Sequence, residues 1–427
     1  MSVFESSTKQ NCSTCIGSER VKLDVGFARN QFPAFSDPGL SKSAFFENAG
    51  GTYPCRQVVD RLIRFYRERK VQPYGEYERS IVGGKEMDEA RTRLAAAIGV
   101  ETDELSFGPS TTQNTYVLAQ AFRSILRSGD AIVVTEQDHE ANVGPWSRLA
   151  DGGVTVRVWK LDPETGHLPI CGLESQLDRR VKLVCFPHCS NIVGEINPVR
   201  TICRMAKDAG AWTCVDGVSY APHGLPNVRS LGADIYLFST YKTYGPHQGV
   251  MAVRRKLGKR LPNQGHEFNA GYPVHRLTPA GPDHAQVAAS AGILDYVDLL
   301  NDHHRGTGIR PDAQCAYVAG LMREHETIVL KPLLDWLSRS NAVRLIGSDK
   351  AEEKVPTVSV LLDRPGQTVA AALSAHGIMA GGGHFYGVRC LKALGIDPTH
   401  GVLRLSFVHY TEADDVARLI DALEMVI

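Results

Sequence analysis

The sequence predicts an α/β fold with a mostly parallel sheet, followed by a smaller α+β unit. Between residues 131 and 255, short apolar runs rich in β-branched residues alternate with helical patterns. Most of these runs are continuously apolar, which is typical of strands that helices cover on both faces. After about residue 290 the alternation gives way to a long helical region, which marks the second unit.

The strands expected in the larger unit lie at 131–136, 154–161, 181–188, 211–217, 233–240 and 249–255. Helical patterns at 111–126 and 198–210 lie between or beside them. We therefore divide the chain into an N-terminal tail and arm (1–40), a large domain (41–295) and a small C-terminal domain (296–427).

In the smaller unit, the helical region 283–340 leads to a strand at 355–363, a helix at 367–377, a glycine-rich loop at 380–387 and a strand at 402–410. We expect the glycine run 381–383 to form a flexible lid, because glycine tolerates conformations that other residues avoid, and a plain hairpin turn is the alternative. A terminal helix is predicted from the spacing of Val416, Leu419, Ile420 and Leu423. Thr411 is its expected N-cap, with Asp414 three residues on.

Composition excludes several classes of protein. The 427 residues are 43% hydrophobic and 22% charged, which suits a large core and not disorder. The 47 basic and 47 acidic residues cancel, which argues against a nucleic-acid or membrane-surface role. No apolar run approaches the roughly 20 residues that a membrane-spanning helix needs.

The ten cysteines are scattered, and several lie in strand-like runs, so we expect a reducing, cytoplasmic compartment. The N-terminus has neither a signal-peptide nor a transit-peptide pattern. Cys12 and Cys15 are interpreted as two thiols of a polar tail, since a zinc site would need further ligands nearby. His303-His304 and Glu324-His325-Glu326 are interpreted as solvated helix faces and not as metal ligands.

Asp216 and Lys242 each follow a predicted strand. Ligands of open α/β sheets bind outside the carboxyl ends of the strands, so the two side chains could meet on one ligand. A partly buried lysine can be neutral enough to attack a carbonyl, and a buried carboxylate can keep a pyridine nitrogen protonated. This pair is the pattern of a pyridoxal 5′-phosphate (PLP) site. On its own the pair is also compatible with a solvated lysine and a helix-capping aspartate.

Two further segments favour a PLP site. Ser110, Thr111 and Thr112 precede a helix whose N-terminus can bind a phosphate, although an ordinary Ser/Thr cap would look the same. His139 follows the strand at 131–136, where its imidazole could stack on a flat ring or lie on the surface.

The ordered set STT…DHEAN…HCSNIVGEINP…DGVSY…STYK…GGGHFY…LRLSF resembles the class V aminotransferase family of fold type I PLP enzymes. The resemblance runs from about Phe45 to the C-terminus and is strongest toward the cysteine desulfurase/selenocysteine lyase-like subgroup, sharing the HEANVGPW, STYK-x-x-GPH and FVHY patterns. It implies a seven-stranded, mostly parallel sheet in the large domain, a homodimer and a small amino-acid substrate. The balanced charge predicts no nucleic-acid or membrane partner.

The resemblance assigns a role to each matching residue. Lys242 matches the Schiff-base lysine, Asp216 the partner of the pyridine nitrogen and His139 the ring-stacking histidine. The other implied cofactor-binding residues are Thr111, Thr112, Asn191, Ser219, Ser239 and Tyr241, and the implied substrate-binding residues are Asn191, Arg404, His384 and Tyr386. Arg404 matches the arginine that pairs with the substrate α-carboxylate.

One departure bears on the reaction. Desulfurases of this subgroup carry a cysteine on a mobile loop, and here that position is Tyr386, while Cys390 and Cys189 do not match it. We therefore expect a desulfurase-like lyase that cleaves a C–S or related Cβ bond without a persulfide cysteine. An aminotransferase, a decarboxylating or carbon–carbon bond-forming PLP enzyme of specialised metabolism, and a catalytically silent partner protein stay open as alternatives.

Overall fold

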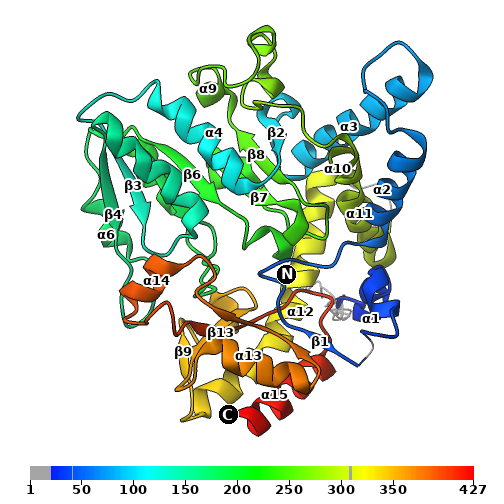
Figure 1. The fold of residues 1–427 in the computed structure, drawn as a ribbon, viewed down its shortest axis with the longest axis vertical. Helices are drawn as coiled ribbons and strands as arrows, with labels where there is room; N and C mark the ends of the chain where they lie inside the picture. Colours follow the sequence, from blue (N-terminus) through cyan, green and yellow to red (C-terminus); the bar gives the residue numbers. More distant parts are fainter. Residues whose placement is uncertain (1–20, 41, 307–309) are drawn as a thin grey trace, which may run out of the picture.

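A seven-stranded sheet lies at the centre of the computed structural model, which describes residues 21–40, 42–306 and 310–427 (Figure 1). The strand order is β2-β8-β7-β6-β5-β3-β4, and β8 alone runs antiparallel to its neighbours. The strands are β2 (Leu105–Gly108), β3 (Ala131–Thr135), β4 (Thr155–Trp159), β5 (Val181–Pro187), β6 (Trp212–Asp216), β7 (Ile235–Ser239) and β8 (Gly249–Val253). The predicted α/β class is confirmed, and the six expected strands are all present. β2 is an additional edge strand, for which sequence analysis gave no residue range.

Helices cover both faces of this sheet. Consecutive strand residues point to opposite faces, and apolar side chains on both faces need a helix to pack against. Ile132 and Val134 of β3 pack with α4 (Thr111–Arg123) in one core cluster, whereas Val133 packs in another cluster with α7 (Val199–Asp208). The residues on both faces of β3 are apolar, which explains why its sequence is a continuous hydrophobic run.

The remaining helices of this part are α2 (Arg56–Glu68), α3 (Glu78–Ala97), α5 (Gly144–Ser147), α6 (Ile170–Glu174), α8 (Val228–Leu231) and α9 (Arg255–Gly258). The predicted helical region at 283–340 comprises α10 (His284–Ala289), α11 (Ala291–Arg305) and α12 (Pro311–Arg339).

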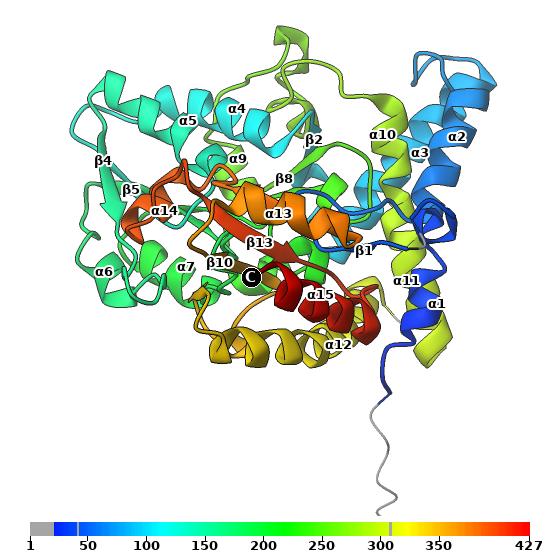
Figure 2. The ribbon, with the colours of Figure 1, turned by 60° about the horizontal axis from the view of Figure 1, so that its bottom comes forward.

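The C-terminal part carries a four-stranded antiparallel sheet of order β12-β13-β10-β9. Its strands are β9 (Arg344–Ile346), β10 (Thr357–Leu361), β12 (Gly381–Gly383) and β13 (Val402–Ser406). Figure 2 shows α12, α13 (Gly366–Ala375) and α15 (Ala413–Val426) grouped around this sheet. Two short strands, β1 (Ala44–Phe45) and β11 (Ile378–Met379), pair in parallel beside it, and α14 (Val388–Ala393) precedes β13.

Two local predictions for this part were wrong. The glycine run is not a flexible loop: Gly381–Gly383 form β12, and a Cβ atom at Gly382 would overlap the backbone of Gly366. Glycine serves close packing here and not flexibility. The N-cap of α15 is Glu412 and not Thr411, because the Glu412 and Asp415 side chains bond each other's backbone N–H groups in a capping box.

Helix α12 belongs to two cores. Val318, Leu321 and Met322 pack with the large sheet, whereas its later residues from Val329 to Leu337 pack with the small sheet and α15. Pro332 lies inside the second stretch, and proline lacks the N–H that would bond the carbonyl four residues earlier. The predicted domain boundary at 295/296 falls inside α11 (Ala291–Arg305), and the next helix serves both parts, so this boundary stays a prediction.

Residues 21–40 pack against the C-terminal region. α1 (Val25–Arg29) is held by an ion pair of 2.8 Å between Arg29 and Asp415, and the fully buried Phe32 contacts the Tyr296 and Tyr410 rings edge-on. Cys12 and Cys15 lie outside the described residues. No helix within the described ranges is both long and apolar enough to cross a membrane.

The prediction of a solvated face at Glu324–Glu326 was wrong for Glu326. Its side chain is fully buried, and both carboxylate oxygens lie 3.0 Å from the Nδ1 atom of His223. Arg323 adds a contact of 3.3 Å. These partners hold the pKa of Glu326 below its usual value in spite of burial, which acts in the opposite direction.

Candidate active site

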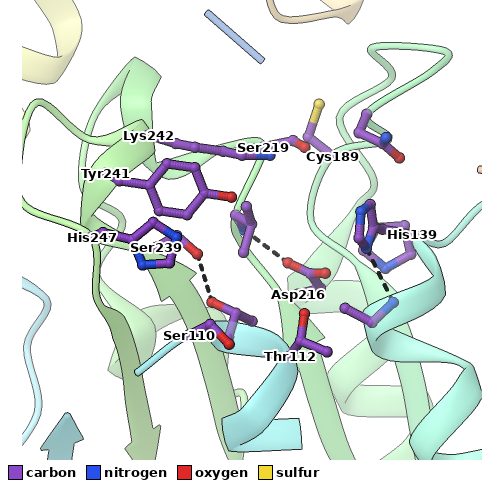
Figure 3. A pocket seen from close by; sticks show the side chains of 15 residues that line it. Ser110, Thr112, His139, Cys189, Asp216, Ser219, Ser239, Tyr241, Lys242 and His247 are labelled. Atoms are coloured by element: carbon purple, nitrogen blue, oxygen red, sulfur yellow. Dashed lines mark hydrogen bonds between the residues drawn. The ribbon is translucent and has the colours of Figure 1, made fainter. Parts of the chain in front are cut away.

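A cavity of about 200 Å³ opens at the carboxyl ends of the central strands (Figure 3). Polar residues from five chain segments line it: Ser110, Thr111, Thr112, His139, Cys189, Asn191, Asp216, Ser219, Ser239, Tyr241, Lys242 and His247. All nine residues expected to bind the cofactor are among them. Parallel strands bring these segments together because their carboxyl ends share one edge of the sheet.

Lys242 lies in a short 3₁₀ turn (Thr240–Lys242) directly after β7. Its side chain is buried, and burial lowers the pKa of its amine from 10.5 to about 8, with Arg404 acting in the same direction and Asp216 and Glu47 opposing. A substantial neutral fraction at physiological pH makes this amine a competent nucleophile toward a carbonyl.

Asp216 is the last residue of β6 and is buried at the floor of the cavity. Its Oδ1 atom accepts a hydrogen bond of 2.9 Å from the Val218 N–H, which fixes the carboxylate. Burial raises the pKa of Asp216, whereas the Val218 N–H and the Lys242 amine act to lower it. A fixed carboxylate in this position suits a protonated ring nitrogen.

His139 presents a neutral imidazole to the cavity. Burial lowers its pKa to about 3, and the positive Lys242 and Arg404 act in the same direction. The Ala141 N–H donates to Nδ1 over 3.0 Å, so the ring proton lies on Nε2. A flat, uncharged ring held in one orientation is suited to stacking.

Hydroxyl groups gather at the opposite end of the cavity. Ser110 caps α4, accepting from the Gln113 N–H, and Thr111 and Thr112 begin the helix. The Thr111 and Ser239 hydroxyls lie 2.8 Å apart, so two chain segments supply donors at one point. A helix N-terminus with several hydroxyls binds a phosphate well.

Sequence analysis gave no role to His247, which lines the same end of the cavity. Its ring stacks on Tyr241 with centroids 4.7 Å apart and planes within 10°. The signal was present in the STYK-x-x-GPH pattern, but a lone histidine after a turn has no distinguishing spacing.

Arg404, His384 and Tyr386 do not line this cavity. Arg404, in β13, is 3% exposed and adjoins the site through Asn191, whose backbone oxygen accepts from its Nη1 atom over 3.3 Å. His384 is exposed, and its Nδ1 atom accepts from the Tyr386 N–H.

The loop that carries Tyr386 is tied to the large sheet. The Tyr386 carbonyl accepts from the Glu140 N–H over 2.9 Å, and the Phe385 carbonyl accepts from the Asn191 side chain over 2.9 Å. Phe385 and Tyr386 both have positive φ, at 48° and 57°, which costs about 1 kcal/mol or more for each residue. The Tyr386 ring is 66% exposed, with its centroid 5.3 Å from that of His139.

The two cysteines nearest the site are poorly suited to accept sulfur. Cys189 is buried, with Sγ 3.3 Å from the Gly194 carbonyl oxygen, and burial raises its thiol pKa strongly. Cys390 is fully buried in α14, with its pKa raised to about 12. Only the thiolate is nucleophilic, so burial disfavours both cysteines as sulfur acceptors.

The donor set fits PLP. Asp216 would hold the ring nitrogen, His139 a ring face and the hydroxyls at Thr111 and Ser239 the phosphate, with Lys242 positioned for the aldehyde. The Asn191 Oδ1 atom is buried without a hydrogen-bond partner, which leaves an acceptor for a bound group. No group of three metal-ligating side chains is placed to hold a metal ion in the parts of the chain that the structure describes.

Comparison with known proteins agrees with this geometry. The model of the family "Aminotransferase class-V" matches residues 44–272 and 317–419. The chain is 32% identical to the aminotransferase-like protein FGM3 of Gibberella zeae over 420 residues, covering 93% of this chain and 97% of that protein. It is 27% identical to a cysteine desulfurase of Serratia proteamaculans over 416 residues, with the same coverage.

Solved structures show the same fold. A cysteine desulfurase from Thermococcus onnurineus NA1 superposes with a TM-score of 0.82 at 24% identity, covering 95% of this chain and 98% of that one. The cysteine desulfurase CsdA from Escherichia coli gives a TM-score of 0.79 at 21% identity, covering 95% and 99%. The chain therefore belongs to the class V aminotransferase family of PLP-dependent enzymes.

Proposed function

We propose that this protein is a desulfurase-like lyase that breaks a Cβ–S or related Cβ bond of a small α-amino acid, using PLP held by Lys242, and that it does so without a persulfide cysteine. The observation that supports the proposal best is the convergence of Lys242, Asp216 and His139 on one cavity, where burial raises the thiol pKa of the nearest cysteines. Bound PLP supplies an electron sink for charge that develops at Cα.

The residues of the chain divide the remaining tasks. Arg404 and Asn191 bind the substrate α-carboxylate at the edge of the cavity, and Lys242 removes the proton at Cα as a general base with a pKa near 8. Asp216 keeps the cofactor's ring nitrogen protonated, and His139 covers one face of the ring. His384 and Tyr386 lie on the loop above, where they would contact a substrate side chain from outside.

The proposal predicts which products cysteine gives. Elimination converts cysteine and water to pyruvate, hydrogen sulfide and ammonia, whereas desulfuration through a cysteine acceptor gives alanine and a protein persulfide. PLP-loaded protein incubated with cysteine should release pyruvate or sulfide and carry no persulfide by intact-mass spectrometry. Lys242→Ala is the control without the amine. Tyr386→Cys, which places an exposed thiol beside His139, tests whether the loop position accepts sulfur. Persulfide on wild-type Cys189 or Cys390 would refute the proposal.

Transamination is the second candidate, favoured by the relative named as an aminotransferase-like protein at 32% identity. Under this proposal a panel of amino acids would give keto acids and convert PLP to its amine form, with no loss of a Cβ substituent. Decarboxylation or carbon–carbon bond formation would appear in the same panel as carbon dioxide or a heavier product. Absence of any Cα hydrogen exchange in heavy water would instead support a silent partner protein.

We also propose that the protein is a homodimer. Tyr74, Phe268 and Tyr272 are 56%, 77% and 61% exposed on neighbouring segments, and such gathered aromatic side chains are typical of protein interfaces. Sedimentation analysis of the PLP-loaded protein tests this, with Phe268→Asp expected to shift the mass toward the monomer.

A further inference from the structure

The buried guanidinium of Arg404 already has a carboxylate partner within the chain. Glu47, two residues after β1, places Oε1 2.7 Å from the Arg404 Nη2 atom. Arg404 is 3% exposed, whereas the Glu47 side chain is 29% exposed. The internal ion pair therefore occupies the group that is expected to bind a substrate carboxylate.

Arg404 makes two further contacts within the chain, and its Nε atom has no hydrogen-bond partner. The guanidinium lies over the Phe385 ring, with its central carbon 3.7 Å from the ring centroid, and Nη1 donates to the Asn191 carbonyl. The Nε atom is buried without a partner, as is the Oε2 atom of Glu47. The pair thus uses one hydrogen bond where a bidentate arrangement offers two, and both unused atoms remain able to bond a ligand.

Two glycines make room for the Glu47 carboxylate. Gly381 pairs directly with Arg404 across β12 and β13, and a Cβ atom there would overlap Oε2 of Glu47. A Cβ atom at Gly50 would lie 2.7 Å from Oε1, closer than van der Waals contact allows. The position of Glu47 is therefore built into the backbone on both sides and is not a chance rotamer of a surface side chain.

We propose that Glu47 is a specificity-determining residue that competes with the substrate α-carboxylate for Arg404 and must be displaced when that carboxylate binds. This inference rests on the proposed function, in which Arg404 is the carboxylate-binding residue. Two carboxylates beside one guanidinium repel each other, so Glu47 weakens binding of simple α-amino acids. It acts on ligands that carry a carboxylate and leaves plain amines unaffected.

The test compares ligands that differ only in the carboxylate. PLP-loaded wild type, Glu47→Gln and Glu47→Asp are titrated with L-alanine and with ethylamine, following cofactor absorbance. Glu47→Gln should tighten alanine binding about tenfold or more, equivalent to about 1.4 kcal/mol, without changing ethylamine binding. Glu47→Asp keeps the charge but is one methylene shorter, so its effect should lie between. Glu140→Gln removes a carboxylate that pairs with Arg389 instead, and is the matched control.

Three outcomes would overturn the proposal. Weaker alanine binding by Glu47→Gln would show that Glu47 orients Arg404 for its ligand. Unchanged binding would show that the two carboxylates do not compete. Equal tightening of alanine and ethylamine would place the effect on Lys242, whose pKa the Glu47 charge raises.

A cofactor-free measurement separates this proposal from the proposed function. Propionate has a carboxylate and no amine, so its binding to the apo protein needs Arg404 but not PLP. Calorimetry should show tighter propionate binding by Glu47→Gln than by wild type, and no binding by Arg404→Ala. That result would stand even if the protein turned over no amino acid, whereas equal propionate affinity in wild type and Glu47→Gln would refute the competition itself.

Discussion

Replacing Lys242 with methionine should stabilise the apo protein at neutral pH. A buried amine whose pKa is lowered from 10.5 to about 8 disfavours its charged form in the folded state. At about 1.36 kcal/mol per pKa unit, this penalty amounts to about 3 kcal/mol. Methionine has a similar length and no charge, so Lys242→Met removes the penalty.

The sign of the pH dependence follows from proton binding. Between pH 8 and 10.5 the unfolded chain binds more protons at residue 242 than the folded chain does, so wild-type stability rises with pH across this window. The stability difference between Lys242→Met and wild type should therefore be fully present at pH 7 and fall by about 3 kcal/mol toward pH 10.5.

Urea denaturation of both apo proteins at pH 7 and pH 10.5 measures this change. Any packing effect of the methionine does not depend on pH and cancels in the comparison. Lys85→Met, at an exposed position on α3, is the matched control for loss of a lysine charge in solvent. A stability difference that stays constant between the two pH values would refute the assignment of a desolvated amine at Lys242.

Three further changes should give measurable losses. Asp216→Asn should retain PLP, seen by absorbance, but lower kcat by about 100-fold or more, since the ring nitrogen loses its charged partner. Glu326→Gln should cost about 3–5 kcal/mol in urea denaturation at pH 7, because it removes the buried carboxylate that contacts the His223 ring and pairs with Arg323. The folded-state pKa of Glu326 is lowered, so this loss should shrink as the pH falls below 4.5; a constant loss would contradict the ion pair. Phe32→Ala should cost about 3–5 kcal/mol by calorimetric or chemical unfolding, since its ring is fully buried; an unchanged midpoint would show that the N-terminal arm is not part of the core.

The large sheet could be predicted from sequence because its signal is local. Five of the six expected strands are mostly apolar and mostly buried, as coverage on both faces requires, whereas the edge strand β4 carries Arg157 and is only partly buried. β2 was not predicted, since four residues ending in a glycine turn carry too little pattern. Lys242 and Asp216 were predicted to meet because strand ends share one edge of the sheet.

The features that sequence could not supply depend on contacts between distant segments. Glu47 and Arg404 are separated by 357 positions, and neither neighbourhood signals the pair. The burial of Glu326 follows from the packing of α12 on His223, which helix periodicity alone does not specify. Glycines 381–383 suggested mobility, yet a side chain at Gly381 would overlap Glu47 and one at Gly382 would overlap Gly366.

The division of α12 between two cores has a mechanical consequence. Arg404 lies in β13 of the small sheet and Lys242 directly follows β7 of the large one, so a tilt of one sheet against the other would change their separation. Such a tilt must bend α12, whose two halves are anchored on opposite sides. Pro332 has no N–H to bond the Ile328 carbonyl, so α12 lacks one backbone hydrogen bond there. This position is close to where the packing of α12 passes from the large sheet to the small one. We therefore expect α12 to bend most easily at this point if the sheets tilt, and its stiffness would limit how closely the proposed carboxylate-binding arginine approaches Lys242.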